Sequence, residues 1–310
     1  MGKVTVKPKA HQYISPVHVE LIEAFDQHWY RKIDARTGEI IADIPSVTTI
    51  LGAAPKPWLL KWYGDLGWDG AKKARRDAQD RGSRVHWAIN KIVTGGGVIY
   101  VPPPQKLQRL SPDEIQQISV EHAGNVATLQ RDDECCQVGR FIEWLIEVKP
   151  VPIAAEEMVI STKQDCAGTL DLGFRIPTGE YQIAGERKMK VLGGFYIIDI
   201  KTGAKSDDHI LQLAAYCKLW EEMHPDTPVA GAMVIYTNAA TQKGIAGLNT
   251  VQFTLPELDE AWLEFKDVQR VWLRRNKNKR PEILHFSPYM SWEWAKQNRA
   301  YVSNLREAIR

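Results

Sequence analysis

The sequence lacks the features that mark secreted, membrane and nucleotide-hydrolysing proteins. Only 4 of its 310 residues are cysteines, and they form no CxxC pair and no Cys/His zinc pattern. Adjacent cysteines such as Cys135 and Cys136 rarely pair with each other, so we expect reduced thiols rather than disulfides. No apolar run is long enough to span a membrane or to serve as a signal peptide, and no GxxxxGK[ST] phosphate loop occurs. These absences predict a soluble, cytoplasmic protein with no membrane partner.

Charge of neither sign dominates. The chain has 40 basic and 38 acidic residues, for a formal net charge of +2. A nucleic-acid partner would therefore have to be recognised by local basic patches rather than by the bulk charge.

Strand-like and helix-like segments alternate along the chain. Strands are predicted at 28–41 (two strands around Thr37-Gly38), 151–161, 167–176, 194–201, 229–236 and 248–254. Helices are predicted at 68–93, 112–148 with a break near Gly124 or Gly139, 207–223, 256–275 and 290–308. This order predicts an α/β (α+β) fold, with a mixed central sheet flanked by helices and a helical region towards the N-terminus.

We expect the chain to form a single domain, residues 1–310. Its predicted parts are an N-terminal hairpin and opening segment (1–67), a helical region that carries His86 (68–150), a core sheet with its helix (151–255) and C-terminal helices (256–310).

The most informative residues are Asp199-Ile200-Lys201, at the end of a predicted strand. Side chains alternate along a strand, so Asp199 and Lys201 share one face. The predicted neighbouring strand carries Asp171 in the sequence Gly-Thr-Leu-Asp, and the two strands would pair antiparallel. A carboxylate beside an ammonium is suited to metal-dependent phosphodiester hydrolysis, although an ion pair at a strand edge would have the same pattern.

Two further segments bear on this choice. Gln212 and Tyr216 are four residues apart on a predicted helix, so they share a face that would pack beside the end of the Asp199 strand. His86 lies in a basic helix far upstream, where a lone histidine is more often structural.

Taken in order, these segments resemble a known family. The series Gly82-Ser-Arg-Val-His86, Glu156, Gly168-Thr-Leu-Asp171, Asp199-Ile-Lys201 and Gln212-x-x-x-Tyr216 is similar to the RecB-like branch of the PD-(D/E)XK nuclease superfamily. The similarity extends over about residues 44–236, and Ile44–Leu51 looks like the opening segment of the mitochondrial genome maintenance exonuclease and its phage relatives.

The resemblance implies a restriction-endonuclease-like fold and a metal site. It implies Mg²⁺ or Mn²⁺ as the cofactor, and metal ligands at His86, Asp171, Asp199, the carbonyl of Ile200 and Glu156. It also implies catalytic or supporting roles for Asp171, Asp199, Lys201, Gln212 and Tyr216. An imidazole ligand would favour Mn²⁺ over Mg²⁺. Relatives that hold an iron–sulfur cluster use three cysteines after the nuclease core, and no cysteine follows Cys217, so no cluster is expected.

Substrate contacts are predicted from charge and position. Candidates are Arg84, Arg187, Lys188, Lys190 and Thr202. Three of them lie in the insertion from Pro177 to Gly194, which could be a basic finger that reaches DNA or a solvated loop. A cationic run from Arg270 to Arg280 would follow a phosphate backbone, although charge runs are usually solvated faces. Trp87 is expected in the core.

The sequence therefore predicts a metal-dependent deoxyribonuclease. We favour an exonuclease that acts on single-stranded or frayed DNA ends in recombination, repair or replication, with a recombination or replication protein as a candidate partner. The alternatives are a non-catalytic DNA-binding or assembly protein that keeps the fold, and an end-trimming nuclease of the CRISPR-adaptation type without an iron–sulfur cluster.

Overall fold

The structure is a computed structural model. It describes residues 17–24, 27–54, 56–101, 110–183, 187–240 and 246–277, and a few positions beyond them (281, 291, 296, 297 and 299). The chain divides into two compact units, the first made of residues 1–43 with 278–310 and the second of residues 44–277. Apart from those few positions, the helix predicted at 290–308 lies outside the described residues, as do Lys279 and Arg280 of the cationic run.

The first unit contains a small antiparallel sheet in the order β1-β2-β3. Its strands are β1 (Val17–Ala24), β2 (Gln27–Asp34) and β3 (Ile40–Pro45). The turn between β2 and β3 has Gly38 at φ 74°, a left-handed conformation that glycine adopts without a steric penalty. The two strands predicted at 28–41 are confirmed, and β1 adds a third that was not predicted.

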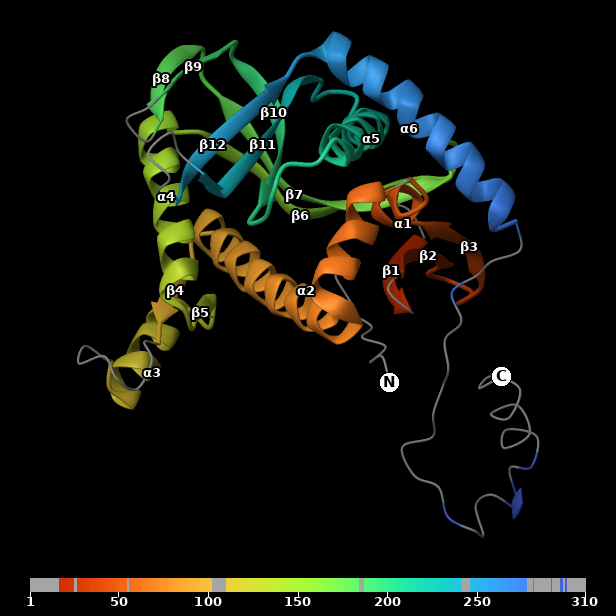
Figure 1. The fold of residues 1–310 in the computed structure, drawn as a ribbon, viewed down its shortest axis with the longest axis horizontal. Coiled ribbons are helices and arrows are strands. Elements are labelled where there is room, and N and C mark those ends of the chain that lie inside the picture. The colour runs from red at the N-terminus through yellow and green to blue at the C-terminus, as the bar shows by residue number, and fades with distance from the viewer. Residues whose placement is uncertain are drawn as a thin grey trace. The chain divides into compact units, whose positions relative to one another are not determined.

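The second unit is built on a five-stranded sheet in the order β12-β11-β10-β7-β6 (Figure 1). The strands are β6 (Val151–Ser161), β7 (Cys166–Ile176), β10 (Gly194–Lys201), β11 (Val229–Ala240) and β12 (Ala246–Phe253). β10 and β11 pair parallel and the other neighbours pair antiparallel, so the sheet is mixed, as predicted.

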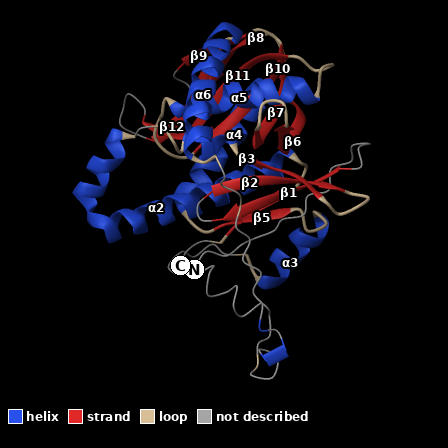
Figure 2. Ribbon diagram, turned by 90° about the vertical axis from the view of Figure 1, so that its right-hand side faces the viewer, coloured by secondary structure: helices blue, strands red, loops and turns tan. Residues whose placement is uncertain are grey.

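Helices cover both faces of this sheet (Figures 1 and 2). The helices α5 (Asp208–Met223), α6 (Leu255–Arg275) and the short α1 (Val47–Leu51) lie on one side. On the other side, α2 (Pro57–Val93) and α4 (Asp132–Val148) pack into a core with alternate residues of the strands, including Leu172, Ile198 and Met233. Because side chains alternate, Asp199, between Ile198 and Ile200, faces the α5 side, where Gln212 contacts it.

The segment between α2 and α4 differs from the prediction of one long helix. α3 (Pro112–Glu121) ends before Gly124, which has φ 75°, and a strand β5 (Val126–Leu129) follows and pairs parallel with β4 (Gly97–Tyr100). The predicted break near Gly124 is confirmed, but the helix across 126–129 is wrong. The physical reason is tertiary: Ala127 and Leu129 are buried in the core beside α4, where a paired strand presents them.

The insertion between β7 and β10 forms a hairpin of β8 (Gly179–Ile183) and β9 (Arg187–Val191). Ile183, Met189 and Val191 are buried in the same core, so one face of the hairpin is anchored rather than solvated. Residues 184–186, between β8 and β9, lie outside the described residues.

Two expectations drawn from absences can be compared with the structure. The four cysteines are free thiols, as predicted. Among the described residues, none of the helices combines the length and the apolarity that crossing a membrane requires.

Candidate functional site

Asp199 and Lys201 lie together at the end of β10. The strand is apolar up to this point, so Asp199 is carried into the interior and is only 1% exposed. The Lys201 ammonium lies 2.9 Å from Asp199 Oδ1 and 2.7 Å from Oδ2. Burial raises the pKa of Asp199 to about 6, against the opposing effect of Lys201. Asp199 and Lys201 therefore share a face, as predicted, and their side chains form an ion pair in which the carboxylate is buried.

Asp171 meets this pair because β7 and β10 part from each other at this point. Their pairing ends at Ile198–Leu172, and the same register continued would set Asp171 opposite Asp199. The Asp171 carboxylate accepts the backbone N–H of Ile200 at 2.8 Å, which takes the place of a ladder hydrogen bond. Burial alone would raise the pKa of Asp171, but His86, Lys201 and this N–H together lower it.

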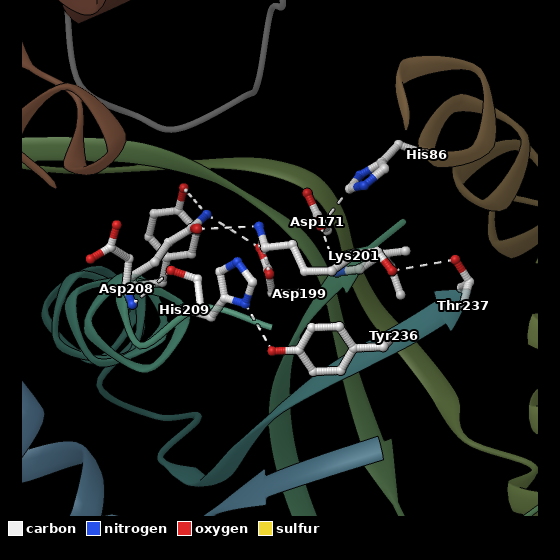
Figure 3. Close-up of polar contacts among 12 residues, drawn as sticks. His86, Asp171, Asp199, Lys201, Asp208, His209, Tyr236 and Thr237 are labelled. Carbon is white, nitrogen blue, oxygen red and sulfur yellow. Dashed lines mark hydrogen bonds and ion pairs between the residues drawn. The ribbon is translucent and has the colours of Figure 1, made fainter. Parts of the chain in front are cut away.

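His86 reaches the same carboxylate from α2 (Figure 3). Its Nδ1 lies 3.4 Å from Asp171 Oδ2. Burial opposes the charged imidazolium, yet the pKa of His86 is raised because the Asp171 charge outweighs that cost. α2 passes close to the exit of β10: a methyl group added at Gly82 would lie 3.2 Å from Thr202 Oγ1. The glycine of the Gly82–His86 series therefore keeps α2 near the site.

Gln212 and Tyr216 support the ion pair from α5. The Gln212 amide donates to Asp199 Oδ1 at 3.2 Å and to the Tyr216 hydroxyl at 3.1 Å, while its Oε1 accepts from Lys201 at 3.3 Å. The Tyr216 ring is buried against Gly168, where an added Cβ would lie 2.3 Å from Tyr216 Cε1. The structure thus brings His86, Asp171, Asp199, Lys201, Gln212 and Tyr216 into one connected cluster.

Glu156 occupies a distinct backbone position near this cluster. Ala155 pairs with Leu172 and Glu157 with Leu170, so Glu156 stands opposite Asp171 on the neighbouring strand. Its φ is 50°, which is uncommon for a residue other than glycine within a strand. It is half-buried.

The predicted substrate residues that the structure describes differ in their surroundings. Arg84 donates to the fully buried Glu134 at 2.6 Å and 2.9 Å, so it has a structural partner. Lys188 is exposed and paired with Glu180 at 2.9 Å, and Lys190 is exposed on the same face of β9. The side chain of Arg187 lies outside the described residues.

The expectation that Trp87 is in the core is wrong. Its side chain is 49% exposed, and the Lys91 ammonium lies 4.2 Å from its ring centroid. The neighbouring Val85, Ala88 and Ile89 fill the core-facing stripe of α2, which leaves no place for Trp87 on that side.

Two residues of the site were not predicted from the sequence. His209, on α5, shares a 2.8 Å hydrogen bond with the hydroxyl of Tyr236, which ends the apolar run of β11 (Figure 3). Burial and the nearby Lys201 lower the pKa of His209 to about 4. The spacing could have revealed His209, because it lies three residues before Gln212 on the same helical face.

The cluster has the donor chemistry of a divalent cation site. Among the described residues, no three His, Cys, Asp or Glu side chains are gathered closely enough to coordinate one metal ion. Mg²⁺, however, commonly takes only one or two carboxylates and completes its shell with waters and phosphate oxygens. Asp199 Oδ2 is buried and, apart from its ion pair with Lys201, accepts no hydrogen bond. The buried carboxylate of Asp199 and the half-buried carboxylate of Asp171 therefore fit a cation of this kind.

Comparison with known proteins identifies the family. The search of curated proteins finds no significant match. The sequence pattern of the PD-(D/E)XK nuclease superfamily matches residues 53–309, which include every residue of the cluster. With that match, and with a mixed sheet whose adjacent strands carry Asp171 and Asp199-Ile-Lys201, this chain belongs to the PD-(D/E)XK nuclease superfamily.

Proposed function

We propose that this chain is a divalent-metal-dependent deoxyribonuclease that hydrolyses DNA phosphodiester bonds, and that it acts as an exonuclease. The observation that carries the proposal is the convergence of Asp171, Asp199 and Lys201 at the point where β7 and β10 part. All three side chains are retained in a family of nucleases, which favours an active enzyme over a non-catalytic protein with the same fold.

The residues that would hold the cation are Asp171, Asp199 and the carbonyl of Ile200, with His86 as a nitrogen ligand. Glu156, opposite Asp171 in the register, would hold a second ion through water. When bound, the cation would polarise the phosphoryl group and lower the pKa of an attacking water. The positive charge of the cation would also offset the cost of burying the Asp199 carboxylate, which raises the pKa of that group.

Lys201 would supply the fixed positive charge of the site. Burial acts to lower its pKa, but Asp199 and Asp171 more than compensate and raise it, so the ammonium stays charged at neutral pH. A charged amine held 2.9 Å from Asp199 is suited to orient a water and to stabilise charge that develops on phosphoryl oxygens. Gln212 and Tyr216 would hold the lysine in this position through the hydrogen bonds from α5.

We infer that the substrate is DNA with a free end, single-stranded or frayed. The family supports DNA as the substrate, and the similarity of Ile44–Leu51 to the opening segment of exonucleases supports action at ends. Arg84, Thr202 and the exposed face of β9 that carries Lys188 and Lys190 are proposed to contact the strand. A role in recombination, repair or replication, beside a protein of that pathway, follows from the same resemblance.

The proposal is tested with labelled oligonucleotides. Single-stranded, double-stranded and circular DNA are incubated with the full chain in Mg²⁺, in Mn²⁺ and in excess chelator. We expect linear DNA to be shortened from an end, circles to persist, and chelator to stop the reaction. Lys201→Ala should lose about 100-fold or more in rate, the usual cost of removing one such electrostatic group.

Lys218→Ala is the matched control. Lys218 lies on α5 as well, but it pairs with Asp259 at 2.7 Å on the outer side of the helix. Its loss should leave the rate unchanged. Intact DNA under every condition would refute the nuclease proposal, and equal rates on circles and linear strands would refute the exonuclease.

A further inference from the structure

His209 and Tyr236 form a hydrogen-bonded pair beside the proposed active site (Figure 3). His209 is the second residue of α5 and lies one turn before Gln212, so both side chains are on the face of α5 that meets the sheet. Tyr236 pairs with Lys201 in the parallel register of β10 and β11, so the two side chains point to the same side of neighbouring strand ends. The backbones of Tyr236 and Lys201 are therefore about one strand spacing, roughly 4.8 Å, apart.

Chemistry decides which nitrogen of His209 carries the proton. Burial raises the pKa of Tyr236, so its hydroxyl keeps its proton, while His209 is neutral at pH 7. A phenol is the stronger donor and an imidazole nitrogen the stronger acceptor, so the 2.8 Å bond runs from the Tyr236 hydroxyl to Nδ1. The proton of the neutral ring is then on Nε2. Tyr236 thus fixes His209 as a hydrogen-bond donor through Nε2.

Among the residues that the structure describes, this donor has no hydrogen-bond partner, and the charges that act on His209 are those of Lys201 and Lys56, opposed by Asp208. Lys205 holds its ammonium 5.6 Å from the Tyr236 ring centroid, and Lys56 approaches the same helix end through a 2.8 Å ion pair with Asp208. His209 is half-buried, and a neutral N–H donor near lysine ammonium groups suits an anionic oxygen ligand.

We propose that His209, oriented by Tyr236 and assisted by Lys205, forms a second phosphate subsite that binds the phosphodiester next to the one being cleaved. The subsite rests on the proposed nuclease function, because it needs a strand that also occupies the Lys201 site. The spacing between neighbouring β-strands, extended by the reach of the side chains, is comparable with the distance between neighbouring phosphates along a DNA strand. His209 acts on binding and alignment of the strand, while Lys201 acts at the scissile phosphate.

The test combines substitutions with charge-neutral substrates. Short single-stranded oligonucleotides carry one methylphosphonate, which removes the negative charge, at the linkage on either side of the cleaved one. For the wild type, one of these substrates should lose about 10-fold or more in kcat/KM, the factor expected for one hydrogen bond to a charged group. His209→Phe should lose a similar factor on the unmodified strand and little more on the methylphosphonate.

Conservative variants separate this role from a structural one. His209→Gln keeps a neutral N–H donor near the position of Nε2 and should recover most of the lost kcat/KM. Tyr236→Phe leaves the tautomer of His209 unfixed and should fall between the wild type and His209→Phe. Lys218→Ala, on the outer side of the same helix, should behave as the wild type on every substrate.

The proposal is overturned if the losses in kcat/KM caused by His209→Phe and by the methylphosphonate are additive. If His209→Phe keeps the wild-type kcat/KM, or if it still loses the full factor on the methylphosphonate, another group binds that phosphate. A binding measurement distinguishes failure of the proposed subsite from failure of the nuclease proposal. If the wild type cleaves nothing, fluorescence anisotropy of the same oligonucleotides in chelator decides, and equal affinities of wild type and His209→Phe for the unmodified strand overturn the subsite.

Discussion

The tightest contact at the site is the approach of the Tyr216 ring to the backbone of Gly168, and it yields a quantitative prediction. In Gly168→Ala the new Cβ would lie 2.3 Å from Cε1 of a ring that is only 4% exposed. Ordinary contacts are 3.4 Å or more, so the ring or the strand must move by over 1 Å. Overpacking of a well-filled core costs about 1–3 kcal/mol. Replacing a strand glycine returns about 0.5–1 kcal/mol of backbone entropy, which leaves a net destabilisation of about 1 kcal/mol.

A double-mutant cycle isolates this contact. The free energy of unfolding is measured by urea denaturation for the wild type, Gly168→Ala, Tyr216→Leu and the double variant. Because leucine lacks the ring atom that the new methyl group would meet, Gly168→Ala should cost less than about 0.5 kcal/mol in the Tyr216→Leu background. The coupling energy should therefore be about 1 kcal/mol. The displaced ring also carries the hydroxyl that Gln212 contacts, so nuclease activity of Gly168→Ala should fall together with its stability.

Gly139→Ala should change the free energy of unfolding in the opposite direction. Gly139 lies inside α4, and a methyl group there would have no heavy atom within 4 Å. Alanine should stabilise the helix by about 0.5–1 kcal/mol. If Gly168→Ala also stabilises the protein, or costs the same with and without the Tyr216 ring, the argument from close packing is refuted.

Four other predictions concern stability, pH and metal. Arg84→Ala should cost about 3 kcal/mol in urea denaturation because it leaves the buried Glu134 without its guanidinium, whereas unchanged stability with weaker DNA binding would assign Arg84 to the substrate. Burial opposes ionisation of Glu134, but Arg84 and two backbone N–H groups lower its pKa. The stabilisation that the ionised carboxylate gives to the folded state is therefore fully present above its usual pKa of 4.5 and is lost as the pH falls through the lowered pKa. If the stability of the wild type is no more sensitive to acid than that of Glu134→Gln, this prediction is wrong. Trp87→Ala should cost less than about 1 kcal/mol because the ring is 49% exposed, whereas Trp144→Ala, 1% exposed, should cost about 3–5 kcal/mol; similar costs would show that Trp87 is packed after all. Mn²⁺ should support faster hydrolysis than Mg²⁺, and His86→Ala should lose this preference, while equal or slower turnover with Mn²⁺ in the wild type would argue against histidine ligation.

The order of strands and helices in the core could be read from the sequence because periodicity is local. An apolar run that ends in Asp-Ile-Lys predicts both a buried strand and a shared face for Asp199 and Lys201, and β10 has these bounds. The four-residue spacing of Gln212 and Tyr216 likewise fixed their common face on α5. These properties depend on residues a few positions apart, whose relation is set by the geometry of a single helix or strand.

Only the tertiary structure decided which distant residues meet. His86 reaches Asp171 across 85 positions because α2 packs close to Thr202, and Arg84 on the same helix is paired with Glu134 instead. Trp87 faces solvent because its neighbours already fill the core stripe, and β5 is a strand because β4 lies beside it. The sequence by itself therefore determined the Asp-X-Lys strand and its helix, whereas packing between elements determined which partners complete the site.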